Sequence, residues 1–158
     1  MSTSQVKDKV IVVTGASKGI GLATAQVLIS RSAKVALLAR DKDRLTTAVA
    51  GLKSGNAFGL PVDVCNKSAM EQAFAAVVAK WGRLDGLVNN VGFQYSRRIE
   101  VSPESEIRRL VDLNFLSAVF TCQTAIPLMR KGGGGRIVNV SSASARNVGS
   151  RFCRFFTR

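Results

Sequence analysis

The sequence predicts one α/β domain built on a doubly wound parallel sheet, and three observations carry this prediction. Short apolar runs recur along the 158 residues without alternation of polar and apolar side chains, as in strands buried on both faces. Segments with helical periodicity separate these runs, which is the pattern of βαβ units. A glycine-rich turn, TGASKGIG at residues 14–21, follows the first run. Right-handed crossovers between such units predict the strand order 3-2-1-4-5.

Each expected strand is a short and mostly apolar run. The clearest two read KVIVVT and KVALLA, and their lack of alternating polar positions indicates burial on both faces. A loop of four glycines at residues 132–135 precedes the last run. The expected strands span residues 9–14, 34–39, 57–62, 84–89 and 136–141.

Four helices are expected between the strands, at residues 20–31, 41–53, 66–81 and 103–130. In the second helix an apolar stripe recurs at i, i+4 and i+7, formed by Leu45, Val49 and Leu52. Asn66 is a suitable N-cap for the third helix, and Pro103 suits the first turn of the fourth. The buried stripe of the third helix is predicted to be Met70, Phe74, Val77 and Trp81.

Composition excludes several classes of function. The sequence contains no histidine, which excludes Ser-His-Asp catalysis and most zinc chemistry, and its three cysteines lack C-x-x-C spacing. The net charge of +13 is scattered along polar helix faces, so nucleic-acid binding is not favoured. We expect no membrane span, because no apolar run approaches the ~20 residues that one needs. We expect no signal peptide, because the start MSTSQVKDKV is polar and lacks an apolar h-region. The cytoplasm is the expected location.

The glycine-rich turn is the first candidate site. It follows a buried strand and opens a helix, an arrangement that presents backbone N–H groups to a phosphate. Gly15 allows a tight reversal, and Gly19 and Gly21 lack the Cβ atom that would keep a pyrophosphate and the neighbouring strand apart. The spacing is G-x-x-x-G-x-G, and a plain strand-to-helix turn is the alternative for this motif taken alone.

Five motifs together give the chain a resemblance to the short-chain dehydrogenase/reductase family, over residues 5 to about 145. They are TGASKGIG at 14–21, DV at 63–64, NNVG at 89–92, the asparagine of DLNF (Asn114) and NVSS at 139–142. The resemblance implies a Rossmann-like NADP-binding domain at residues 1–145, followed by an atypical tail at 146–158. It also implies a small carbonyl or alcohol substrate, hydride exchange with a nicotinamide cofactor, and homo-oligomers.

The cofactor is expected at the carboxyl ends of the strands. Arg40 ends the second run and Lys18 lies in the glycine-rich turn, and two cations there suit the 2′-phosphate of NADP(H) rather than NAD(H). Two solvated surface cations are the alternative. The resemblance implies that Asp63 accepts from the adenine amino group, although it could instead cap the next helix. The predicted cofactor residues are Gly15, Ser17, Lys18, Gly19, Ile20, Gly21, Arg40, Asp63, Val64, Asn89, Asn90 and Gly92.

Two residues are candidates for catalysis. Ser142 matches the family's serine, which hydrogen-bonds the substrate oxygen. Asn114 matches an asparagine that holds a water in a proton relay, and a structural asparagine paired with backbone is the alternative. It falls inside an expected apolar stripe formed by Ile107, Leu110, Val111, Ala118 and Cys122.

The family pattern breaks after Ser142. The family's general acid/base tyrosine, thirteen residues on, corresponds to Phe155, and the lysine four further on would be residue 159, beyond Arg158. We therefore expect a C-terminally shortened sheet without its last strands and little or no turnover. Tyr95 is expected to be a loop aromatic at the substrate cleft. The alternatives are a non-catalytic nucleotide-binding remnant or subunit, and a basic interaction module with an Arg- and Phe-rich tail at 146–158.

Overall fold

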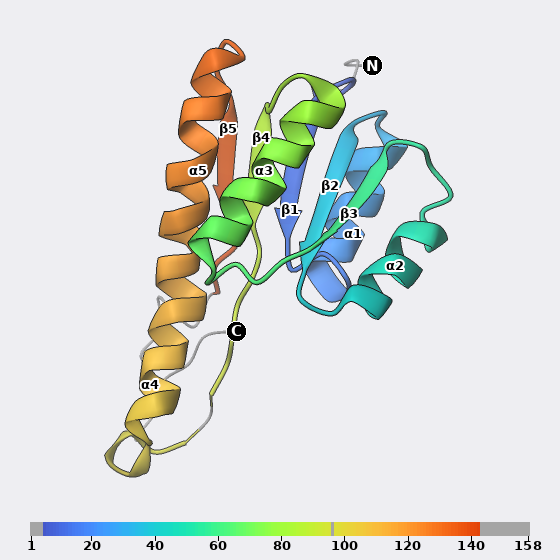
Figure 1. Cartoon of the computed structure of the whole chain (residues 1–158). Helices are drawn as coiled ribbons and strands as arrows, with labels where there is room; N and C mark the ends of the chain where they lie inside the picture. Colours follow the sequence, from blue (N-terminus) through green and yellow to red (C-terminus); the bar gives the residue numbers. More distant parts are fainter. Residues whose placement is uncertain (1–4, 96, 143–158) are drawn as a thin grey trace.

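The computed structural model describes residues 5–95 and 97–142. Within them a five-stranded parallel sheet has the order β3-β2-β1-β4-β5, which confirms the predicted order 3-2-1-4-5. Helices cover the sheet on two sides, with α3 and α5 on one face and α1 and α2 on the other (Figure 1). The strands are β1 (Val10–Thr14), β2 (Lys34–Ala39), β3 (Ala57–Pro61), β4 (Gly86–Asn89) and β5 (Arg136–Asn139). The helices are α1 (Gly19–Ser30), α2 (Lys42–Gly51), α3 (Lys67–Trp81), α4 (Glu104–Val111) and α5 (Ser117–Lys131).

Strand β1 shows why the apolar runs carry no alternation. Val10 and Val12 face the core under α3 and α5, whereas Ile11 and Val13 face the core under α1 and α2. Successive side chains of a strand point to opposite faces, so a strand between two helical layers must be apolar at every position. The same holds for β2, in which five of six residues are buried.

Side-chain and backbone caps set the ends of the helices that follow β2 and β3. Asn66 accepts a hydrogen bond from the Ala69 N–H at 3.0 Å, which confirms the predicted N-cap of α3. Asp41 caps α2 in the same way, accepting from the Arg44 N–H at 2.9 Å. Gly82 ends α3 in the left-handed region at φ 78°.

The helix expected at residues 103–130 differs from a regular α-helix. A five-residue π segment, Asp112–Leu116 (η2), lies between α4 and α5, and a 3₁₀ turn at Ile99–Val101 (η1) precedes them. Pro103 is the N-cap instead of a first-turn residue. The wider π turn shifts the side-chain register, so Val111, expected in the buried stripe, is 48% exposed and Leu113 is buried instead. The observed buried stripe is Leu110, Leu113, Ser117, Thr121, Ala125 and Met129.

The continuous helical stretch Glu104–Lys131 is also long and apolar enough to cross a membrane by length and composition, because an 18-residue window within it has a mean hydropathy of 1.2. This is weak evidence for a span, because the core helix of a soluble protein meets the same criteria. Its α5 part packs against α3 and β4 (Figure 1).

Asp85 joins β1 to β4 at the amino ends of these strands, the end of the sheet opposite the glycine-rich turn. Its largely buried carboxylate accepts from the Val10 N–H at 2.9 Å, from Arg83 Nε and from Lys9 Nζ. Burial alone would raise the pKa of Asp85, but the hydrogen bonds from Arg83 and Val10 and the nearby positive charges outweigh it and lower the pKa.

Candidate functional site

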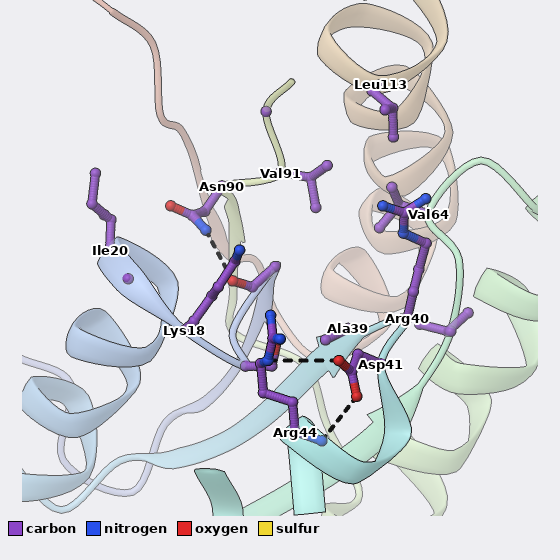
Figure 2. A pocket seen from close by; sticks show the side chains of 15 residues that line it. Lys18, Ile20, Ala39, Arg40, Asp41, Arg44, Val64, Asn90, Val91 and Leu113 are labelled. Carbon is purple, nitrogen blue, oxygen red and sulfur yellow. Dashed lines mark hydrogen bonds and ion pairs between the residues drawn. The ribbon is translucent and has the colours of Figure 1, made fainter. Parts of the chain in front are cut away.

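A cleft of about 740 Å³ lies at the carboxyl ends of the strands, where the loops after β1, β2, β3 and β4 meet (Figure 2). This is the crevice in which doubly wound folds bind ligands. Nine of the twelve predicted cofactor residues line it. The lining comprises Gly15, Ser17, Lys18, Gly19, Ile20, Ala39, Arg40, Asp41, Arg44, Val62, Val64, Asn90, Val91, Gly92 and Leu113.

The glycine-rich turn has the geometry of an anion cradle. Gly15 and Gly19 have φ angles of +64° and +56°, in the left-handed region that favours glycine. A Cβ on Gly19 would meet nothing within 4 Å, so the backbone there opens onto free space. Helix α1 begins with no side-chain cap and no acidic residue in its first turn. Its first N–H groups and helix dipole therefore face the cleft and suit a pyrophosphate.

Gly21 is needed for packing. A Cβ at Gly21 would lie 2.5 Å from the Gly15 carbonyl oxygen and 2.6 Å from Asn90 Nδ2. The start of α1 and the loop after β4 therefore approach each other more closely than any other residue type permits. Gly21 lies under the cleft and is absent from its lining.

Asn90 and Thr14 hold the two cleft loops together. The Asn90 side chain donates to the Thr14 carbonyl oxygen at 3.0 Å and to the Gly15 carbonyl oxygen at 3.4 Å. In return Thr14 Oγ1 accepts from the backbone N–H groups of Asn90 at 3.0 Å and Val91 at 3.3 Å. Thr14 was not among the predicted site residues, because a threonine that ends a strand carries no distinguishing pattern.

Three cations and one carboxylate line the part of the cleft beside β2. Lys18 comes from the glycine-rich turn, Arg40 follows β2 directly, and Arg44 stands on the first turn of α2. Asp41 accepts from the Arg44 backbone N–H and lies 3.6 Å from Arg44 Nε (Figure 2). The sequence analysis identified Lys18 and Arg40 but missed Arg44. Its place in the first turn of the helix expected after Arg40 could have revealed it.

The end of the cleft beside β3 is apolar, formed by Ala39, Val62, Val64 and Leu113. Such a surface suits the faces of an adenine ring. Asp63 itself is absent from the lining, and its carboxylate accepts from the Cys65 N–H at 3.0 Å, in a turn before α3. Its contact with adenine stays a prediction.

The Cys65 thiol in that turn is not suited to act as a nucleophile. Burial raises the pKa of Cys65, and the neighbouring carboxylates, Asp63 first, raise it further against the opposing charge of Arg40. A raised pKa keeps the thiol protonated and unreactive near neutral pH.

Asn89 lies beneath the cleft. Its Nδ2 donates to Asn139 Oδ1 at 2.8 Å, and its Oδ1 accepts from Thr121 Oγ1 at 2.7 Å. The side chain therefore joins β4 to β5 and α5, and Asn89 is absent from the cleft lining. Its predicted contact with the cofactor is not tested by this geometry.

A second cavity of about 390 Å³ continues from the first, with Ile20, Asn90, Val91 and Gly92 common to both. The catalytic candidates Asn114 and Ser142 both line it, together with Phe93, Gln94, Val140 and Ser141. The structure thus brings the two predicted residues to one cavity beside the cofactor cleft. Tyr95, expected at the substrate cleft, is absent from this lining, and Phe93 supplies the aromatic ring. Phe155 lies outside the described residues.

Asn114 is paired with backbone. Its Oδ1 accepts from the Phe93 N–H at 2.8 Å, and its Nδ2 donates to the Phe93 carbonyl oxygen at 2.9 Å. This two-point contact fixes the loop after β4 against the π segment. Arg109, one turn earlier, stacks on the Phe93 ring with 4.3 Å between its guanidinium carbon and the ring centroid. The backbone-paired alternative for Asn114 is therefore what the described residues show, and its relay role is untested.

Comparison with known proteins agrees with this geometry. The family model described as short chain dehydrogenase matches residues 9–155. A D-beta-hydroxybutyrate dehydrogenase from Rhizobium meliloti is 40% identical over 139 residues, covering 85% of this chain and 54% of that protein. An uncharacterized oxidoreductase from Staphylococcus aureus is 33% identical, covering 89% and 61%. A solved short-chain type dehydrogenase/reductase from Mycobacterium ulcerans superposes with a TM-score of 0.87 at 32% identity, covering 92% and 55%. The chain thus spans a little more than half the length of these relatives.

Proposed function

Because this chain belongs to the short-chain dehydrogenase/reductase family, we propose that it binds NADP(H) in the cleft at the carboxyl ends of its strands. The reaction type we propose is the interconversion of a carbonyl and a secondary alcohol. One observation carries the choice of NADP(H): Lys18, Arg40 and Arg44 face the cleft beside β2, whereas Asp41, the one carboxylate among the described residues that line it, is paired with Arg44. A site for NAD(H) would instead offer a carboxylate to the ribose 2′-hydroxyl.

NADP(H) supplies or accepts a hydride when it is bound. The glycine-rich turn holds the pyrophosphate on the first N–H groups of α1, and the apolar surface at Val62 and Val64 takes the adenine. Ser142 donates its hydroxyl hydrogen to the substrate oxygen in the adjoining cavity. Asn114 fixes the loop after β4 through the backbone of Phe93 and so gives that cavity its shape.

Turnover also needs a group that exchanges a proton with the substrate oxygen. At the position where the family's pattern has a tyrosine the sequence has Phe155, which carries no ionisable hydroxyl. We propose that this chain binds the cofactor and reduces carbonyl compounds slowly or not at all. A location in the cytoplasm stays a prediction of the sequence.

Titration calorimetry of the full chain with NADPH and with NADH tests the cofactor proposal. We expect NADPH to bind at least about tenfold more tightly, because a 2′-phosphate adds charge-assisted hydrogen bonds. Arg40→Asp should weaken NADPH far more than NADH, since a carboxylate there repels the phosphate. Equal affinities of the unmodified chain for the two nucleotides would refute the NADP(H) preference.

A direct NADPH-oxidation assay, set beside the binding titration, separates cofactor binding from turnover. The chain is mixed with NADPH and a panel of carbonyl compounds, and loss of NADPH absorbance is followed with Ser142→Ala as the matched control. We expect NADPH binding without oxidation above the background of that control. Oxidation that depends on the chain and falls in Ser142→Ala would show that another group replaces the missing phenol.

A further inference from the structure

An apolar depression lies on the sheet beside α1. Helices α1 and α2 pack on β1, β2 and β3 (Figure 1), and on the same side β4 and β5 border a depression of about 580 Å³. Val138 of β5 is 54% exposed, and Val140, just after this strand, is 41% exposed. Parallel sheets of doubly wound folds are covered on both faces. Within residues 5–95 and 97–142, this part of the sheet therefore has an apolar face without a cover.

The depression has an apolar floor and a basic rim. It runs along β5, because the alternate residues Arg136, Val138 and Val140 all line it. The rest of the floor is formed by Ile11, Leu28 and Val88. At the amino ends of the strands the rim carries the cations Lys9, Arg83 and Arg136, together with Asp85, which pairs with the first two. This rim repels a basic group directed inward, so an occupant must meet the depression with apolar side chains.

The sixteen residues after Ser142 offer such an apolar side in their sequence. They lie outside the described part of the chain, and residues 148–158 read VGSRFCRFFTR. Apolar side chains recur in this stretch at i, i+4, i+7 and i+8, the spacing of one helix face, formed by Val148, Phe152, Phe155 and Phe156. At 100° per residue its three arginines fall outside that face, at Arg151, Arg154 and Arg158.

We infer that residues 148–158 form a helix that packs its apolar face into the depression and covers Val138 and Val140. The chain leaves β5 at Asn139 and passes Val140, which lines the depression, before it reaches Ser142. Residues 143–147 are enough for the reversal, since connections of about two to six residues are common. The segment then runs back along β5. Its eleven residues measure about 16 Å as a helix, and the strand from Arg136 to Val140 measures about 13 Å.

The position of this segment in the chain favours its own sheet over other occupants. A second copy of the chain and an anionic membrane surface both suit an apolar face bordered by arginines. A segment joined to β5 by a short connection, however, has an effective concentration of about millimolar beside its own depression. The intrachain contact does not depend on the proposed cofactor. It gives the phenylalanine at position 155 a role in packing.

Cross-linking in the full chain tests the contact. Val138→Cys places a thiol on the floor of the depression, and Cys153, next to Phe152, supplies the second thiol. Val111→Cys is the matched control, because Val111 is 48% exposed and stands on α4. With a short bismaleimide at micromolar protein concentration, we expect peptide mapping to find the intrachain 138–153 link in most Val138→Cys chains. The corresponding 111–153 link should be rare.

Two results of the cross-linking would overturn the inference. Equal yields of the 138–153 and 111–153 links would show that the segment has no preferred place on the sheet. A link between two chains in Val138→Cys, seen as a dimer on a denaturing gel, would assign the depression to a second copy.

Thermal unfolding gives a second readout that needs no introduced thiol. We expect Phe152→Gln to lower Tm by about 4 °C or more, because the lost ring would otherwise be buried against the sheet. Arg151→Gln, one residue earlier and outside the apolar face, should shift Tm by no more than about 1 °C. An unchanged Tm in Phe152→Gln would contradict the inference. If Phe152→Gln instead abolishes cosedimentation with phosphatidylserine vesicles and leaves Tm unchanged, the apolar face belongs to a membrane contact and the inference is wrong.

Discussion

Replacing Gly19 and Gly21, two glycines of the same turn, by alanine should damage the protein in different ways. In Gly21→Ala the new methyl would lie 2.5 Å from the Gly15 carbonyl oxygen and 2.6 Å from Asn90 Nδ2, so the backbone itself must move. In Gly19→Ala the methyl would meet no atom within 4 Å, and the cost is that of an alanine at φ +56°. Only the first substitution disturbs packing.

The magnitudes follow from these contacts. Overpacking costs about 1–3 kcal/mol, and Gly21→Ala belongs near the upper end because one of the contacted atoms is backbone. For a chain of this size a loss of about 3 kcal/mol lowers Tm by about 6–12 °C. An alanine in the left-handed region costs about 1–2 kcal/mol. The Gly19 methyl would nevertheless project from the lining of the cleft, where a phosphate must approach the start of α1.

Urea unfolding and NADPH titration of the same samples separate the two effects. We expect Gly19→Ala to lose at least about tenfold in NADPH affinity with a small loss of stability, and Gly21→Ala to lose mainly stability. Gly55→Ala is the control, because Gly55 is exposed, has open space at its Cβ and lies outside the left-handed region. Unchanged NADPH affinity in Gly19→Ala, or a Gly21→Ala chain as stable as the control, would refute the assignment of the two glycines.

Two further predictions concern stability. The lowered pKa of Asp85 means that its contribution to stability is present above the unfolded pKa of about 3.9 and is lost as pH falls through the folded pKa. In urea unfolding the stability difference between the native chain and Asp85→Asn should therefore shrink as the pH is lowered below about 4, and a constant difference would contradict this. Asn114→Ala removes its two hydrogen bonds to the Phe93 backbone, and calorimetric unfolding should show a loss of about 1–3 kcal/mol. A smaller loss would mean that water replaces the amide.

The sheet could be predicted from the sequence because each strand carries its own local pattern. The order 3-2-1-4-5 is confirmed, and the interior strands β1 and β2 are apolar at nearly every position because each faces two helical layers. The ends of the elements differ from the expected ones by one or two residues in most cases. The N-cap at Asn66 was predictable because its hydrogen bond to Ala69 joins residues three positions apart.

The helix across residues 103–130 could not be predicted in detail, because its register depends on tertiary contacts. The predicted stripe assumed 3.6 residues per turn throughout, and the π segment at Asp112–Leu116 breaks that assumption. The segment contains Asn114, whose amide holds the backbone of Phe93, twenty-one residues earlier in the chain. A long-range contact of this kind leaves no periodic pattern, so Val111 was expected inside and is exposed.

The residues of the candidate site likewise fall into those that local sequence spacing predicts and those that depend on contacts between distant segments. Residues that present backbone or charge to the cleft, such as Gly19, Lys18 and Arg40, follow from local spacing and were predicted. The contacts that hold the loops together could not be predicted, because the partners come from distant segments: Thr14 accepts from the loop after β4, and Asn89 joins β5 and α5. Arg44 is an intermediate case, since its tie to Asp41 is local but its relation to Lys18 depends on the packing of α2 beside the glycine-rich turn. Short motifs thus supply the charges and backbone groups of the cleft, and contacts between these motifs set its shape, so a change at Thr14 should alter nucleotide binding by moving the two cleft loops that it holds together.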